Sequence, residues 1–185
     1  MSFELNPKVT VSIVFVAALA MSIMDTTIVN VALPALSSQF KVPSTSIDAV
    51  IVGYMVSLAM IIPASGWLGD RWGTKRVFLL ALILFIGSSA LCGLATSLPM
   101  LVCFRVLQGI GGGALTPIGN TLLYRAFPQA ERVRIARILN IPIVIAPAVG
   151  PVVGGLLVAK LSWRWIFYIN LPIGLATCIF GWLFL

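Results

Sequence analysis

The 185-residue sequence has no histidine and only three cysteines. Cys92, Cys103 and Cys178 all lie within apolar stretches and lack the spacing of metal ligands. We therefore interpret them as small buried hydrophobic residues, and neither a zinc site nor a disulfide framework is supported. The sequence also lacks a phosphate-binding loop, a pair of catalytic carboxylates and a nucleophile–base set. We accordingly expect no enzyme and no bound metal or organic cofactor.

Charged residues are scarce as well, at 9% of the chain, while 60% is hydrophobic and the mean hydropathy is +1.10. A soluble domain has about 25% charged residues and about 45–50% apolar ones. These values indicate an integral membrane protein in contact with lipid. The net charge of +7 comes from 12 basic and 5 acidic residues. Because the basic residues cluster between apolar stretches, they act as topology signals, and we expect no nucleic-acid partner.

The apolar stretches predict an all-α bundle of six transmembrane helices, since one span needs about 20 mostly apolar residues. No soluble domain fits between them, so residues 1–185 are expected to form a single transmembrane bundle. The expected spans are approximately 9–35, 46–68, 76–96, 99–123, 134–159 and 165–185. Ala18-Leu19-Ala20 resembles a signal-peptide cleavage site, but the apolar run continues to Leu36, which favours an uncleaved first span.

The distribution of basic residues between the loops predicts the orientation. Three of them, Lys41, Lys160 and Arg164, fall on the side opposite the N-terminus. The side of the N-terminus carries Lys8, Arg71, Lys75, Arg76, Arg125, Arg132, Arg134 and Arg137. Basic loops stay in the cytoplasm, so we expect a multi-pass protein of the cell membrane (the inner or plasma membrane) with a cytoplasmic N-terminus.

Two opposite charges lie inside the predicted spans, Asp25 in the first and Arg105 in the fourth. A charge at bilayer depth costs about 2.5–3.5 kcal/mol on insertion scales and usually faces a polar cavity or an ion path. Counted from the same membrane side at about 1.5 Å per residue, Asp25, Arg105 and Gln108 are expected at similar depth. Two readings stay open: a static pair that joins spans one and four, and one wall of a cavity.

The turn Gly66-Trp67-Leu68-Gly69-Asp70-Arg71-Trp72-Gly73-Thr74-Lys75-Arg76 is dense in glycine and charge. Glycine permits a tight reversal and close backbone approach, and Asp70 could face the positive end of a neighbouring helix. A solvated cytoplasmic loop would explain the basic residues equally well, but not Gly66, Gly69 and Gly73.

The fifth span contains small residues four apart and two prolines. Ala146, Gly150 and Gly154 predict a ridge for close helix contact, and Pro147 and Pro151 each remove a backbone hydrogen bond and favour a kink. Ordinary helix packing and a bending gate are both compatible with this pattern. At the start of the sixth span, the segment Trp163-Arg164-Trp165 is typical of interfacial anchoring.

Together these segments resemble the N-terminal half of a major facilitator superfamily transporter, in particular the branch of 14-helix drug:proton antiporters of the multidrug efflux type. The resemblance covers nearly the whole chain. The matching segments are Asp25 to Pro34, Gly66 to Arg76, Arg105 with Gln108 and Gly109, Gly150-Pro151 with Gly154-Gly155, and Trp163 to Asn170 followed by Pro172 and Gly174.

The resemblance implies the N-terminal six-helix bundle of that fold, built from two three-helix repeats, in a proton-driven exporter of amphipathic or cationic compounds. Asp25 would be the protonatable coupling residue and Arg105 its electrostatic partner, and both would line a substrate cavity with Asn30 and Gln108. The energy source would be the proton gradient. The cytoplasmic gate loop would comprise Gly66, Asp70, Arg71, Gly73, Lys75 and Arg76, and the helix bend would comprise Gly150, Pro151, Gly154 and Gly155.

The chain departs from the pattern in two details and in length. Thr74 stands where the loop motif usually has a basic residue, and Ala146 where the fifth-helix motif often begins with glycine. Such a transporter needs a second half to close its cavity, so we expect that a C-terminal half or a partner half is required. The alternatives are an exporter of one specific metabolite and a truncated membrane fragment without transport activity.

Overall fold

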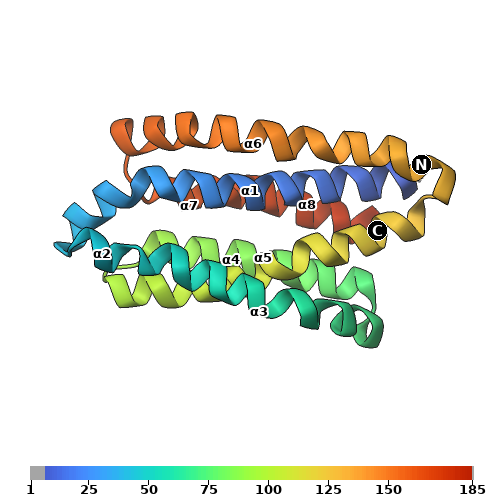
Figure 1. Ribbon diagram of the computed structural model, residues 1–185, viewed down its shortest axis with the longest axis horizontal. Coiled ribbons are helices and arrows are strands. Elements are labelled where there is room, and N and C mark those ends of the chain that lie inside the picture. The colour runs from blue at the N-terminus through green and yellow to red at the C-terminus, as the bar shows by residue number, and fades with distance from the viewer. Residues whose placement is uncertain (1–6, 185) are drawn as a thin grey trace.

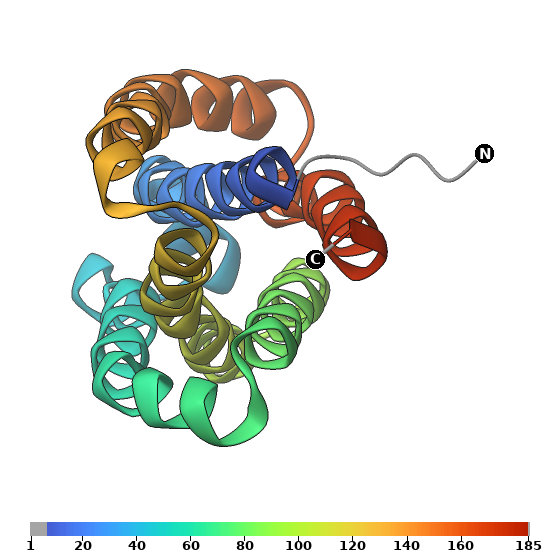
Figure 2. The ribbon, with the colours of Figure 1, turned by 90° about the vertical axis from the view of Figure 1, so that its right-hand side faces the viewer.

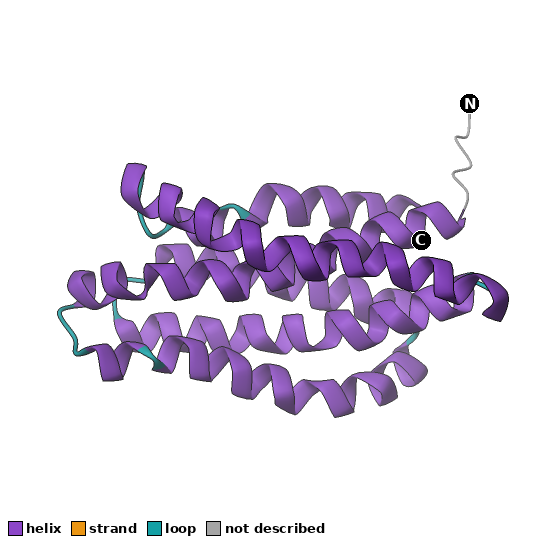
Figure 3. Ribbon diagram, turned by 45° about the horizontal axis from the view of Figure 1, so that its top comes forward, coloured by secondary structure: helices purple, strands orange, loops and turns teal. Residues whose placement is uncertain are grey.

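The computed structural model describes residues 7–184, and six of its helical segments are long and apolar enough to cross a membrane. No strand occurs in this described part (Figure 3), which confirms the predicted all-α membrane fold. The predicted sixth span, 165–185, extends one residue beyond it. The helices are α1 (Pro7–Phe40), α2 (Ser44–Ile47), α3 (Ala49–Trp72), α4 (Thr74–Leu94), α5 (Leu98–Ala126), the 3-10 turn η1 (Gln129–Glu131), α6 (Arg132–Lys160), α7 (Trp165–Tyr168) and α8 (Asn170–Phe184).

Helix α1 is longer than the sequence suggests, because it does not end at Pro34. It continues to Phe40 with Pro34 inside it. A proline removes only its own N–H donor, so the helix loses the single bond to the carbonyl of Asn30 while later amides still pair. At about 1.5 Å per residue α1 is about 51 Å long, well over the roughly 30 Å of a hydrocarbon core.

Two of the six spans consist of a short helix followed by a long one. Ser44–Trp72 combines α2 and α3, and Trp165–Phe184 combines α7 and α8. In the second case Pro172 lacks the N–H that would bond to the carbonyl of Tyr168. Pro172 lies in the first turn of α8, where a proline is tolerated, and the break falls between Tyr168, the last residue of α7, and Asn170, the first of α8.

The packing pairs of the helices repeat within the bundle (Figures 1 and 2). Helix α3 packs along α5 as α6 packs along α1, and α4 contacts α5 as α8 contacts α1. Exchanging the first three spans with the last three turns α1 into α5 and α4 into α8. The remaining large contacts, α1 with α5 and α4 with α8, are therefore unchanged by the exchange. This exchange is what two three-helix repeats produce, and it confirms the predicted architecture.

Glycines on α5 allow its close approach to α3. A methyl group on Gly109 would collide with the carbonyl of Tyr54 and the hydroxyl of Ser57, and one on Gly113 would collide with the backbone of Leu58. Both obstacles include main-chain atoms, which cannot move without displacing α3. Small residues four apart thus set the distance between these two helices.

We expect Gly109→Ala to lower the stability of the bundle by about 1–3 kcal/mol, because overpacking forces helices apart. The control is Gly87→Ala, since a methyl group at Gly87 in α4 meets nothing within 4 Å. That variant should be neutral or gain up to about 1 kcal/mol from helix propensity. Melting in detergent, followed by circular dichroism, checks both variants. Equal melting temperatures for the two would contradict a close contact between α5 and α3 at Gly109.

Candidate functional site

A polar cluster lies deep inside the bundle, where four spans meet. Asp25 comes from α1, Ser89 from α4, Arg105 and Gln108 from α5, and Asn170 from the start of α8. Each of these side chains is at most 1% exposed. Burial of this many polar groups is stable only when they satisfy one another.

Asp25 accepts hydrogen bonds from three side chains. Its Oδ2 accepts from Arg105 Nη1 at 2.6 Å, and its Oδ1 accepts from Gln108 Nε2 at 2.9 Å and from Asn170 Nδ2 at 3.0 Å. The donors come from two different helices, α5 and α8. The carboxylate therefore holds α1 to both of them in its ionised form, which has acceptor oxygens only.

Arg105 is fixed by further contacts on its other sides. Its Nη1 also donates to Gln108 Oε1 at 2.8 Å, one turn along the same helix. The guanidinium carbon lies 4.1 Å from the centre of the Tyr54 ring and 5.9 Å from that of Phe167. Cation–π contact of this kind is strongest away from water, so the aromatic rings replace part of the lost hydration of the cation.

Asn170, Ser89 and Tyr54 belong to the site but were not among the predicted site residues. Asn170 donates to Ser89 Oγ at 3.1 Å, and Ser89 donates to the carbonyl of Phe167 at 2.9 Å. Asn170 is a lone amide in an apolar span, and this feature could have marked it as a candidate site residue. Its partner Asp25 lies 145 positions away, so the sequence alone offered nothing to connect them.

Only three of the four residues predicted to line a cavity lie together. Asp25, Arg105 and Gln108 contact one another in the bundle interior rather than an open cavity. Asn30 is exposed, and its Nδ2 donates to the carbonyl of Thr26 at 3.1 Å. A role for these four residues in lining a substrate cavity stays a prediction.

The predicted glycine-rich turn lies at one end of the bundle, but most of it is helical: only Gly73 stands between α3, which ends at Trp72, and α4, which begins at Thr74. Gly73 has φ +89°, a backbone conformation that side chains other than hydrogen resist, and a methyl group on Gly66 would meet nothing within 4 Å. Asp70 Oδ1 lies 3.7 Å from Arg125 Nη2 at the end of α5. Arg71 lies over the Trp67 ring at 5.3 Å. The turn thus ties α3 to α5 through an exposed ion pair, and its role as a gate stays a prediction.

The small residues of α6 face α1. Ala146, Gly150 and Gly154 are buried four apart. A methyl group on Gly150 would collide with Thr27 Oγ1, and one on Gly154 would come within 3.1 Å of Ile28. Gly155 is half-buried and Pro151 is exposed, and the helix runs without interruption through Pro147 and Pro151. The structure shows the packing ridge, whereas the bend that the resemblance implies stays a prediction.

The segment before α7 does more than anchor the bundle at the interface. Arg164 Nη1 donates to the carbonyls of Gly93 at 2.6 Å and Ala95 at 3.2 Å, so Arg164 caps the end of α4. Trp163 is only 6% exposed and packs edge-on against Phe40 and Phe167. Trp165, which is 48% exposed, is placed as an interfacial anchor requires.

A bundle of six spanning helices around a buried carboxylate–guanidinium pair defines a polytopic helical membrane protein with ionisable groups at its centre. A family model described as Major Facilitator Superfamily matches residues 15–185. The chain belongs to that superfamily.

Its relatives and a solved structure agree with this assignment. "Putative multidrug resistance protein MdtD" of Pectobacterium carotovorum is 40% identical over 162 residues, which cover 88% of this chain and 35% of the relative. The protein of the same name in Yersinia enterocolitica is 43% identical over 159 residues, covering 86% and 34%. This chain therefore spans about a third of the length of the curated relatives it matches.

The crystal structure of a bacterial homologue of the human lysosomal transporter Spinster, inward-facing and unoccupied, superposes with a TM-score of 0.74. The alignment covers 96% of this chain and 42% of that one, at 16% sequence identity. At this identity the likeness shows the fold alone.

We expect Arg105→Met to destabilise the bundle by about 3–5 kcal/mol, because it leaves the Asp25 carboxylate buried without its counter-charge. Asp25→Asn combined with Arg105→Met should recover much of that loss, since no lone charge remains. Arg125→Met is the control: its ion pair with Asp70 is exposed and is worth about 0–1 kcal/mol. Denaturation in detergent measures all three, and similar losses for Arg105→Met and Arg125→Met would contradict the role of the buried pair.

Proposed function

We propose that this chain forms the N-terminal part of a proton-coupled exporter of drugs or other amphipathic compounds. The printed name of its 40%-identical relatives supports the class of substrate. The observation that carries the coupling mechanism is the Asp25 carboxylate held by three donors in the bundle interior. An intramembrane carboxylate facing the interior of a helical bundle is characteristic of proton relays.

A neutral Asp25 would weaken the arrangement around it. A carboxylic acid has an O–H donor, yet both of its oxygens face donors: Arg105 at Oδ2, and Gln108 and Asn170 at Oδ1. Neutral Asp25 would also leave Arg105, 1% exposed, without its counter-charge. Taking up a proton therefore favours separation of α1 from α5 and α8, and losing it favours the closed cluster. This is the link between proton transfer and helix movement that antiport requires.

The remaining part of the transporter would supply the opposite wall of the substrate site. The relatives are about three times as long as the matched region. Substrate sites in transporters of this kind lie at the interface between repeats, near the middle of the membrane. We propose that a further set of helices, on the same polypeptide or a partner, closes the cavity.

We propose a cytoplasmic N-terminus in the bacterial cell membrane. The turn between α3 and α4, the start of α1 and the α5–α6 connection lie at one end of the bundle, with the basic residues Lys8, Arg71, Arg125 and Arg132. An excess of basic residues marks the cytoplasmic side.

Asp25→Asn should abolish proton-driven efflux while leaving membrane insertion intact, because asparagine keeps the size of the side chain but exchanges no proton. The measurement uses this chain joined to the remaining two-thirds of the Pectobacterium relative, in inverted vesicles with an imposed pH gradient and a fluorescent cationic substrate. Asp48→Asn is the matched control, since this exposed carboxylate lies outside the cluster, between α2 and α3. Efflux by Asp25→Asn at the rate of the control would overturn the coupling role.

Residues 1–185 alone should give no efflux, since they contribute only part of the proposed cavity wall. The check is proton-dependent efflux of the same dye from cells that produce only this chain, compared with cells that produce the joined protein. Membrane extracts probed by an epitope tag establish that both proteins are inserted. Clear efflux by the short chain in cells without other exporters would refute the need for further helices.

A further inference from the structure

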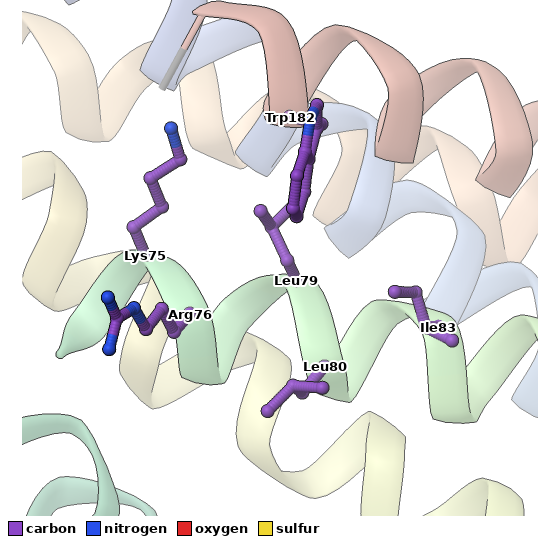
Figure 4. Close-up of a pocket in the computed structure, with 6 residues that line it drawn as sticks. All are labelled: Lys75, Arg76, Leu79, Leu80, Ile83 and Trp182. Atoms are coloured by element: carbon purple, nitrogen blue, oxygen red, sulfur yellow. The ribbon is translucent and has the colours of Figure 1, made fainter. Parts of the chain in front are cut away.

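A hollow of about 480 Å³ lies between α4 and α8 at the end of the bundle that carries the glycine-rich turn. Basic side chains line one end of the hollow, and apolar side chains line the rest. The lining residues are Lys75, Arg76, Leu79, Leu80, Ile83 and Trp182. Figure 4 shows Leu79 pointing towards the Trp182 ring, with Lys75 extending from the preceding turn of α4 towards the end of α8.

The two cations of this hollow differ from four other cations at the same end of the bundle, each of which has a partner within the chain. Lys8 pairs with Glu131 at 2.7 Å, Arg125 with Asp70 at 3.7 Å, and Arg71 and Arg132 lie over aromatic rings. Lys75 and Arg76 are exposed and have no hydrogen bond, ion pair or ring contact to any residue in the described range 7–184. Both side chains line the hollow, so an anion bound there is attracted by both charges.

The apolar part of the hollow begins one helical turn from these cations. Leu80 and Ile83 are 56% and 51% exposed, and Trp182 is 69% exposed. In a membrane-spanning bundle these surfaces contact acyl chains rather than water. The hollow thus joins an acyl-chain surface to two charges that have no partner among the residues that the structure describes. Tryptophan, with an apolar ring and a polar N–H, is suited to the boundary between headgroups and chains.

We propose that this hollow is a binding site for an anionic phospholipid. The lipid phosphate lies against Lys75 and Arg76, and one acyl chain lies along Leu79, Leu80 and Ile83 beside the Trp182 ring. Basic pockets between transmembrane helices bind anionic headgroups in this way. The bound lipid bridges α4 and α8, which belong to different three-helix repeats. The site is independent of transport activity and of which compartment the basic end faces.

Native mass spectrometry of the detergent-purified chain tests the site, with dioleoyl phosphatidylglycerol as the anionic probe and dioleoyl phosphatidylcholine as the zwitterionic one. We expect phosphatidylglycerol to be retained in preference. Lys75→Gln or Arg76→Gln should weaken its binding about fivefold, and the double variant about 25-fold. Trp182→Ala should weaken both lipids, because it removes acyl contact rather than charge.

Arg137→Gln is the matched control. Arg137 is an exposed cation on α6 at the same end of the bundle and does not line the hollow. Equal loss of phosphatidylglycerol binding in Arg137→Gln and Lys75→Gln would overturn the proposal in favour of general surface attraction. Unchanged binding in the double variant would also overturn it, as would displacement of the lipid by millimolar inorganic phosphate, which marks a phosphate site without a lipid chain. Matching circular dichroism of the variants establishes that they are folded.

Discussion

The ion pair between Asp25 and Arg105 is the constraint on which the arrangement of the helices depends. Each charge alone would be costly at membrane depth, and the 2.6 Å contact between them removes that cost only while α1 and α5 stay side by side. These two helices correspond to each other in the two three-helix repeats. The pair therefore sits where the repeats meet, and α8 joins it through Asn170.

Much of this was predictable from the sequence because hydropathy and helix rise give depth along the membrane. The six spans, the pairing of Asp25 with Arg105 and Gln108, and the small-residue ridge of α6 follow from such counting. Rotation about the helix axis was harder to judge. Asn30 lies five residues after Asp25, which places it about 140° around α1 at about 100° per residue, and it is exposed rather than directed into the cluster.

Contacts between segments far apart in the sequence were also hard to predict. The sequence did not indicate which helix the glycines of α5 face; it is α3, with Tyr54 and Ser57 against Gly109. The helix break next to Asn170, the residue that contacts Asp25, was not foreseen in the sixth span. In each case the local residue pattern was visible, while the identity of the packing partner was decided by the fold.

The helices of the bundle are joined by two kinds of contact: close packing at glycines, and hydrogen bonds of the polar cluster. The two kinds differ in how readily the helices that they join can separate. Gly150 and Gly154 let α6 lie close against α1, and Gly109 and Gly113 let α5 lie close against the backbone of α3. Separating either pair would expose surfaces that only glycine allows to meet. The contact of α1 with α5 combines the packing of Phe15 against Gly119 with the polar cluster, whose strength depends on the charge of Asp25. In the proposed coupling, a change of protonation at Asp25 would act on the boundary between two tightly packed helix pairs, where it would shift one pair against the other without disrupting either.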